Sequence, residues 1–114
     1  MPHYMYRMDH AAKVHADDGI LSGLTKLPSE YIRSNVRMTF QDDWTAFSHA
    51  NDMNWRRLMW ANDFPHSDST WPWSQGMLAE QTAQLTAEQT RAILSGNVAD
   101  LYGIDVTALQ PTAG

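Results

Sequence analysis

Residues 58–74 read Leu-Met-Trp-Ala-Asn-Asp-Phe-Pro-His-Ser-Asp-Ser-Thr-Trp-Pro-Trp-Ser, and this stretch decides the fold class. It opens with a short apolar run, residues 58–61, which is typical of a strand buried on both faces in a parallel sheet. After Asp63, two prolines and a Ser-Asp-Ser-Thr cluster exclude regular structure as far as Ser74. The stretch therefore predicts a buried strand that delivers a carboxylate into a polar, aromatic loop.

The elements around this stretch alternate between helix and strand. Val36, Met38 and Phe40 alternate with polar residues, which predicts a strand, and Thr86 with Gln89 forms a capping box that opens a helix. Strands that alternate with helices indicate parallel pairing in an α/β fold. The predicted elements are a helix over residues 1–18, a short helix from Pro28, a strand over 35–41, a helix over 44–50, the strand over 58–61, a helix from Gln75 or Gly76, and a helix from 86 to about 102.

Composition and charge bound the class of protein. The 114 residues suffice for one domain, and 43% hydrophobic with 18% charged residues is typical of a globular chain. No apolar run reaches the roughly 20 residues that a membrane helix needs, so no membrane partner is expected. The net charge of −5 and the scattered Lys and Arg argue against nucleic acid. The absence of cysteine and of a secretory signal predicts a cytoplasmic protein.

Asp63 is the clearest candidate for chemistry, and position alone leaves two interpretations open. Active sites of α/β barrels lie at the carboxyl ends of the strands, where a carboxylate can bind a divalent metal ion or accept a proton. An Asp directly after a strand is, however, more often a turn or capping residue, because its side chain bonds to nearby backbone donors.

A resemblance to a known family favours the first interpretation. Residues 60–74 resemble the segment around the eighth strand in the amidohydrolase-2 family, the relatives of aminocarboxymuconate-semialdehyde decarboxylase. Those proteins carry Asp-aromatic-Pro-His followed by Ser-Thr-Trp-Pro, as residues 63–66 and 69–72 do here. The resemblance extends, less specifically, over residues 5–9, 27–31, 36–43 and 96–103.

This resemblance implies a fold and a domain boundary. The expected architecture is α/β, namely about the last two βα units of a metal-dependent hydrolase TIM barrel. Residues 1–106 would form this partial domain, and residues 107–114 a loose tail. A complete barrel has about 250 residues, so the expectation is a C-terminal portion of a larger enzyme.

The resemblance also implies roles for individual residues. Asp63 would be a metal ligand or the catalytic acid/base beside the metal, which we expect to be a divalent ion, zinc first. His66, Ser69, Thr70 and Trp71 would contact substrate. For His66, a hydrogen bond to a neighbour in the loop is an equally good explanation. For Ser69 and Thr70, hydrogen bonds within the loop are the more common use of such hydroxyls. Trp71 would wall an apolar pocket, although packing against outer helices explains it equally well.

The remaining metal ligands of the family have no counterpart here. The family places a His-x-His pair on the first strand and further histidines on the fifth and sixth strands. This sequence has no His-x-His, and a catalytic metal site takes three protein ligands. We therefore expect the chain alone to lack the full ligand set. The histidines present are His3, His10, His15, His49 and His66.

Three functions follow as hypotheses. The first is a metal-dependent hydrolase segment acting on a small organic substrate, and the second is a non-oxidative decarboxylase of the same barrel family. The third is a non-catalytic piece that associates with the missing barrel portion or with itself, because unpaired strand edges invite pairing.

Overall fold

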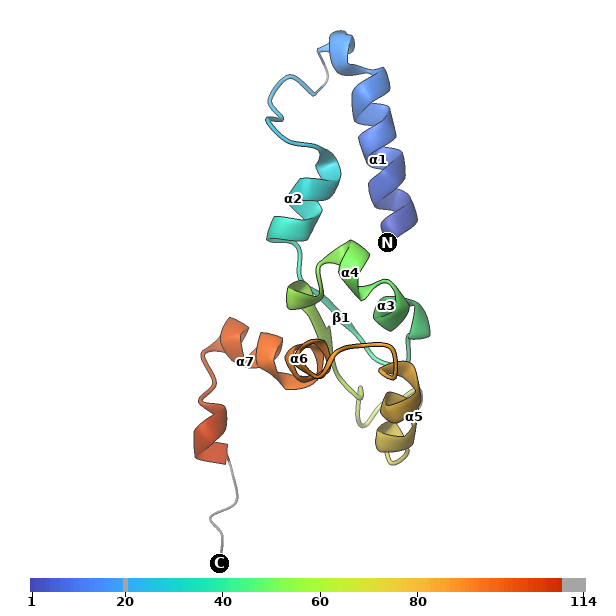
Figure 1. Ribbon diagram of the computed structural model, residues 1–114, viewed down its shortest axis with the longest axis vertical. Helices are drawn as coiled ribbons and strands as arrows, with labels where there is room; N and C mark the ends of the chain where they lie inside the picture. The colour runs from blue at the N-terminus through green and yellow to red at the C-terminus, as the bar shows by residue number, and fades with distance from the viewer. Residues whose placement is uncertain (20, 110–114) are drawn as a thin grey trace, which may run out of the picture.

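A computed structural model describes residues 1–19 and 21–109, and it contains a two-stranded parallel sheet, the helices packed around it and an arm of two further helices (Figure 1). The mixture of strands and helices is the α/β class expected from the sequence. In chain order the elements are α1 (Pro2–Val14), η1 (Ala16–Asp18), α2 (Pro28–Asn35), β1 (Met38–Phe40), α3 (Trp44–Ser48), α4 (Ala50–Met53), η2 (Trp55–Arg57), β2 (Leu58–Trp60), α5 (Ser74–Gln81), α6 (Ala87–Arg91), η3 (Ala92–Gly96), α7 (Asn97–Tyr102) and η4 (Val106–Leu109).

The sheet joins the two strands that the sequence predicts. β1 and β2 run parallel, with Met38 opposite Leu58 and Phe40 opposite Trp60. The ladder continues one residue further, because the Ala61 N–H donates to the Phe40 carbonyl over 3.0 Å. Both carboxyl ends therefore lie at the same edge of the sheet, where Asp63 follows.

The apolar core lies between the sheet and the helices that pack against it. Phe47, Leu58 and Ile93 are at most 1% exposed and belong to one contiguous cluster. Phe40 packs edge to face against Phe47, with 5.0 Å between the ring centroids. The core thus joins the strand pair to the helices between the two strands and to those that follow β2. Its other buried members are Ala46, Ala50, Met53 and Leu78.

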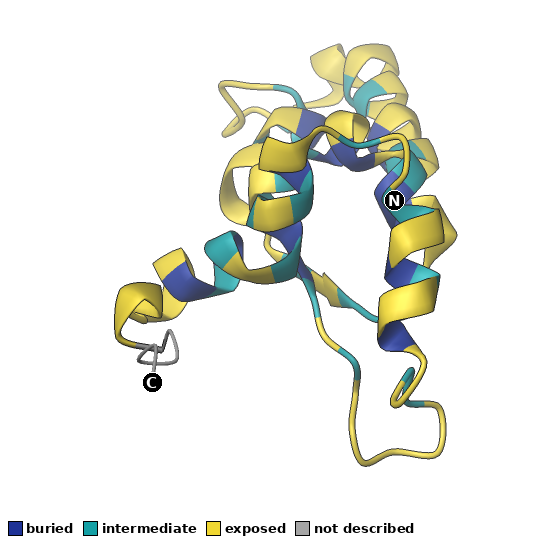
Figure 2. Cartoon of the chain, turned by 60° about the horizontal axis from the view of Figure 1, so that its bottom comes forward, coloured by how far each residue is buried: buried dark blue, intermediate teal, exposed yellow. Residues whose placement is uncertain are grey.

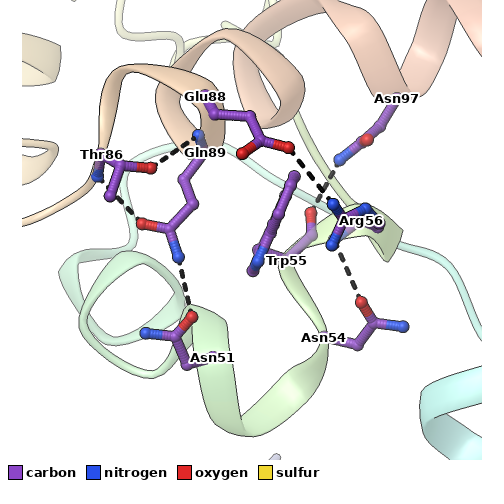
Figure 3. Close-up of polar contacts among 8 residues, drawn as sticks. All are labelled: Asn51, Asn54, Trp55, Arg56, Thr86, Glu88, Gln89 and Asn97. Atoms are coloured by element: carbon purple, nitrogen blue, oxygen red, sulfur yellow. Dashed lines mark hydrogen bonds and ion pairs between the residues drawn. The ribbon is translucent and has the colours of Figure 1, made fainter.

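Polar contacts fasten the closing helices to the segment before β2 (Figure 3). The predicted capping box forms at α6: the Thr86 hydroxyl accepts from the Gln89 N–H, and the Gln89 amide oxygen accepts from the Thr86 N–H. The buried Gln89 side chain also donates to Asn51 over 2.7 Å. Arg56 meets Glu88 at 3.2 Å on the exposed surface.

Asn97 holds the start of β2. Its side chain is 8% exposed, and its amide nitrogen lies 2.7 Å from the carbonyl oxygens of both Trp55 and Leu58. The first contact is visible in Figure 3. The Trp55 carbonyl also accepts from the Leu58 N–H, whereas for the Leu58 carbonyl the buried amide group supplies the donor that the sheet does not, as a buried backbone requires.

The arm of α1 and α2 extends away from the sheet (Figure 1). The two helices contact one another, and the Asp9 carboxylate accepts from the Ser29 N–H over 2.8 Å. Burial raises the pKa of Asp9, but the hydrogen bonds from Ser29 and the charges of Lys13 and Arg33 outweigh it and hold the pKa below its usual range. With this arm the chain measures 66 × 28 × 27 Å.

Several predicted boundaries move. The predicted helix over residues 44–50 is divided into α3 and α4, and the helix predicted from 86 to 102 passes through the π-helical turn η3. Gly103 ends that helix in the left-handed conformation, as expected. Of the predicted loose tail, residues 107–109 lie in η4, and 110–114 lie outside the described residues. No helix in the described part of the chain has the length and apolar character needed to cross a membrane.

Candidate functional site

Asp63 lies at the carboxyl end of the sheet, three residues beyond β2. Its φ of 59° is left-handed, a conformation that Asp adopts more readily than most residues. The preceding Asn62 fixes this turn, because its side-chain oxygen accepts from the Phe64 N–H over 3.1 Å. A left-handed non-glycine residue carries a conformational cost, and such residues cluster at functional sites.

His66 pairs with Asp63 inside the same turn. Its Nδ1 lies 3.1 Å from the Asp63 carboxylate, and its backbone N–H donates to the Asp63 carbonyl over 2.9 Å. Both side chains are open to solvent, 75% exposed for His66 and 44% for Asp63. The turn thus presents a carboxylate and an imidazole together at the surface, an arrangement that can exchange a proton with a bound molecule.

Ser69 and Thr70 bond within the loop. The Ser69 hydroxyl donates to the Asn62 carbonyl over 2.8 Å and accepts from the Trp71 N–H. The Thr70 hydroxyl lies 2.9 Å from the Ser74 hydroxyl. Both hydroxyls therefore shape the loop, which Figure 2 shows as a largely exposed segment projecting from the buried core. Whether either also contacts substrate stays a prediction.

The aromatic side chains of the loop face solvent. Trp71 is 59% exposed and meets Phe64 edge to face, with 6.4 Å between ring centroids. Trp73 is 75% exposed. Trp71 is therefore not buried against an outer helix, which was the alternative open from the sequence. Phe64, which follows Asp63 in the chain, and Trp71 thus present apolar area in this loop.

A shallow hollow connects this turn to β1. It has a volume of about 160 Å³ and is lined by Thr39, Phe40, Gln41, Ala61 and Asp63. The Gln41 amide nitrogen donates to the Asp68 carboxylate over 2.7 Å, which ties the end of β1 to the loop.

The Asp68 contact was missed by sequence reasoning. The two partners lie 27 residues apart, and no spacing rule relates them. The amide oxygen of Gln41 is buried and has no hydrogen-bond partner among the described residues.

The described residues do not fit a metal centre by themselves. Nowhere within 1–19 and 21–109 do three His, Cys, Asp or Glu side chains gather closely enough to hold an ion. Asp63 and His66 would supply two ligands at most, whereas a catalytic site takes three from protein. That the chain alone lacks a full ligand set stays a prediction.

The structure is an α/β fold in which Asp63 lies in the turn just beyond the carboxyl ends of two parallel strands. α/β barrels carry their active-site groups at this edge. Comparison with known families narrows the class. The family model for amidohydrolases matches residues 3–104, most of the chain. The chain belongs to the amidohydrolase family, whose members generally bind divalent metal ions. No curated protein sequence matches the chain.

Proposed function

We propose that this chain provides the last two βα units of an amidohydrolase-type barrel and that the complete enzyme hydrolyses a small organic substrate. The position of Asp63 carries the proposal. A half-exposed carboxylate, held in a left-handed turn and paired with His66, opens into a hollow at the carboxyl edge of a parallel sheet. Membership of the amidohydrolase family supports hydrolysis as the reaction class.

The role proposed for this chain is proton transfer and substrate contact. Asp63 takes up a proton from the attacking water, and His66 orients the carboxylate through the 3.1 Å contact. Trp71 and Phe64 offer apolar area to the body of the substrate. A divalent ion, zinc first, would take its other ligands from residues outside this chain, because the residues present do not complete a set.

The test joins this chain to the first six βα units of another amidohydrolase-family barrel. The hydrolytic activity of the zinc-loaded chimera is then assayed on small amides, lactones and carboxylated aromatics. Asp63→Asn should lower hydrolysis at least about 100-fold, since general acid–base groups contribute factors of this size. Asp100→Asn, at an exposed carboxylate on α7, is the matched control and should leave activity unchanged.

The same assay separates the rival functions. Release of carbon dioxide without hydrolysis would replace the hydrolase with a non-oxidative decarboxylase, which uses the same kind of carboxylate. A chimera that folds but shows neither reaction would favour the non-catalytic module, for which the incomplete ligand set is the specific observation.

Zinc titration of the chain alone tests the ligand argument separately. We expect no tightly held ion. Uptake of about one ion per chain, lost in Asp63→Ala, would show that the chain has its own metal site.

A further inference from the structure

The loop that follows β2 returns to its own start. After Asp63 the chain makes two consecutive turns, in which the His66 N–H donates to the Asp63 carbonyl over 2.9 Å and the Ser69 N–H donates to the His66 carbonyl over 3.0 Å. These turns bring Ser69 back to Asn62, which lies seven residues earlier in the chain. Residues 62–70 therefore form a closed loop with Asp63 near its start.

The peptide unit before Asp63 is held from the far end of this loop. Its carbonyl, which belongs to Asn62, accepts from the Ser69 hydroxyl over 2.8 Å and from the Thr70 N–H over 3.1 Å. A peptide unit is planar, so a bond that fixes the direction of its carbonyl also fixes its N–H, which here belongs to Asp63. The Ser69 hydroxyl thus helps to set the plane that leads into Asp63.

The peptide unit after Asp63 is held as well. Its carbonyl accepts from the His66 N–H over 2.9 Å. Its N–H, which belongs to Phe64, donates to the Asn62 side-chain oxygen over 3.1 Å. The two planes that flank a residue determine its φ and ψ. Asp63 therefore keeps its left-handed φ of 59° because hydrogen bonds fix both planes, as a residue in a costly conformation requires.

The Ser69 hydroxyl uses its one proton within the loop. A serine hydroxyl has a single proton to donate, and here that proton is directed at the Asn62 carbonyl. The same oxygen accepts from the Trp71 N–H over 3.2 Å, and the side chain is half-buried. A substrate that took this proton would release the peptide unit before Asp63. The geometry therefore suits Ser69 to holding the loop rather than to binding substrate.

We propose that Ser69 is a positioning residue for Asp63. Its hydroxyl holds the peptide unit between Asn62 and Asp63, and through that unit it keeps the carboxylate at the hollow that Asp63 lines. Ser69 itself does not touch substrate. The inference deepens the proposed function and rests on it for the reaction, whereas the orientation of Asp63 can be measured without any reaction.

Residual dipolar couplings of the full chain, measured by NMR, test the orientation. In Ser69→Ala the coupling of the Asp63 N–H should fall at least about twofold, because its peptide unit then samples several orientations. Ser69→Thr keeps the hydroxyl and should keep the parental coupling. Ser69→Cys keeps the shape but donates weakly, so it should show a smaller change in the same direction. The coupling of the Met59 N–H, in the middle of β2, should stay unchanged in all three variants.

Ser67→Ala is the matched control. Ser67 is an exposed serine in the same loop and takes no part in these contacts, so its loss should leave the Asp63 coupling as in the parent. An unchanged Asp63 coupling in Ser69→Ala and Ser69→Cys would overturn the proposal. An equal change in Ser67→Ala would also overturn it, because the loop would then respond to any loss of a hydroxyl.

Kinetics of the zinc-loaded chimera distinguish positioning from substrate contact. A positioning residue acts only through Asp63, so Ser69→Ala should lower kcat at least about tenfold at an unchanged KM, and Ser69→Thr should restore most of the loss. A raised KM with an unchanged kcat would make Ser69 a substrate contact and overturn the proposal. An inactive parental chimera would refute the proposed hydrolase, and the couplings would still decide whether Ser69 orients Asp63.

Discussion

The two ends of β2 are built in opposite ways. At its start, Leu58 is 1% exposed, its carbonyl is held by Asn97, and Ile93 packs in the same cluster. At its end, the chain enters a loop in which Asp63 and His66 are solvent-accessible and pair with each other. Only three strand residues separate these environments.

This contrast indicates that the two ends of β2 have different roles, one in stability and one in presenting polar groups. Buried contacts at the start fix where the strand ends, and the exposed end can then carry polar groups that the core could not accept. The buried contacts at the start stabilise the strand. They can thereby offset the conformational cost of Asp63, which is left-handed, beyond the other end. Substitutions at the start should therefore affect stability more than those at the end.

The largest expected effect is at Ile93. Ile93→Ala removes a fully buried side chain next to β2 and leaves a cavity, so the free energy of unfolding should fall by about 2–5 kcal/mol. Urea denaturation measures the loss. Val106→Ala, at a half-exposed position, is the control and should change stability by less than about 0.5 kcal/mol.

A smaller loss is expected at Asn97. Asn97→Ala leaves the Leu58 carbonyl without its donor and the Trp55 carbonyl with only that of the Leu58 N–H, which should cost about 1–3 kcal/mol by the same measurement. Asn35→Ala, at an exposed asparagine, should cost almost nothing. A loss at Asn97 no greater than at Asn35 would show that this contact does not hold the start of β2.

At the open end, two substitutions separate the backbone from the carboxylate. Asp63→Ala should cost about 1 kcal/mol, because alanine tolerates the left-handed conformation less well than Asp does. Asp63→Gly should leave stability unchanged within about 0.5 kcal/mol, because glycine adopts that conformation freely. If Gly and Ala variants lost equal stability, the carboxylate rather than the backbone would be the stabilising group.

The smallest effect concerns pH and the arm. Because the folded state lowers the pKa of Asp9, its contribution is present above the unfolded value near 3.8 and is lost as pH falls through the lower folded value. The α1–α2 contact should therefore loosen below about pH 4, while the start of β2 is unaffected. The Ser29 amide resonance follows this change, and Asp9→Asn should abolish its pH dependence.

Features set by neighbouring residues could be predicted from the sequence. The capping box of Thr86 and Gln89 lies within one helical turn, and the stop at Gly103 needs only a residue that tolerates positive φ. The apolar run of β2 was equally visible. The location of Asp63 after that run follows from the same local pattern, although its catalytic role stays a prediction.

Features set by distant residues could not be predicted. Asn97 reaches carbonyls 39 and 42 residues earlier, and Gln41 meets Asp68 across 27 residues. In α1 the buried residue is Met5, whereas the large side chains of Tyr4 and Met8 are exposed. The face that a helix buries depends on where its partner helix lies, and a single sequence does not contain that position.

The elongated shape of the chain has a practical consequence for its handling. A particle of 66 × 28 × 27 Å experiences more friction in water than a sphere of equal mass and elutes earlier from a gel-filtration column. A monomer of 12.9 kDa would therefore have the elution volume of a larger globular standard. Calibration against globular standards would overstate the mass of such a monomer, so mass must come from light scattering.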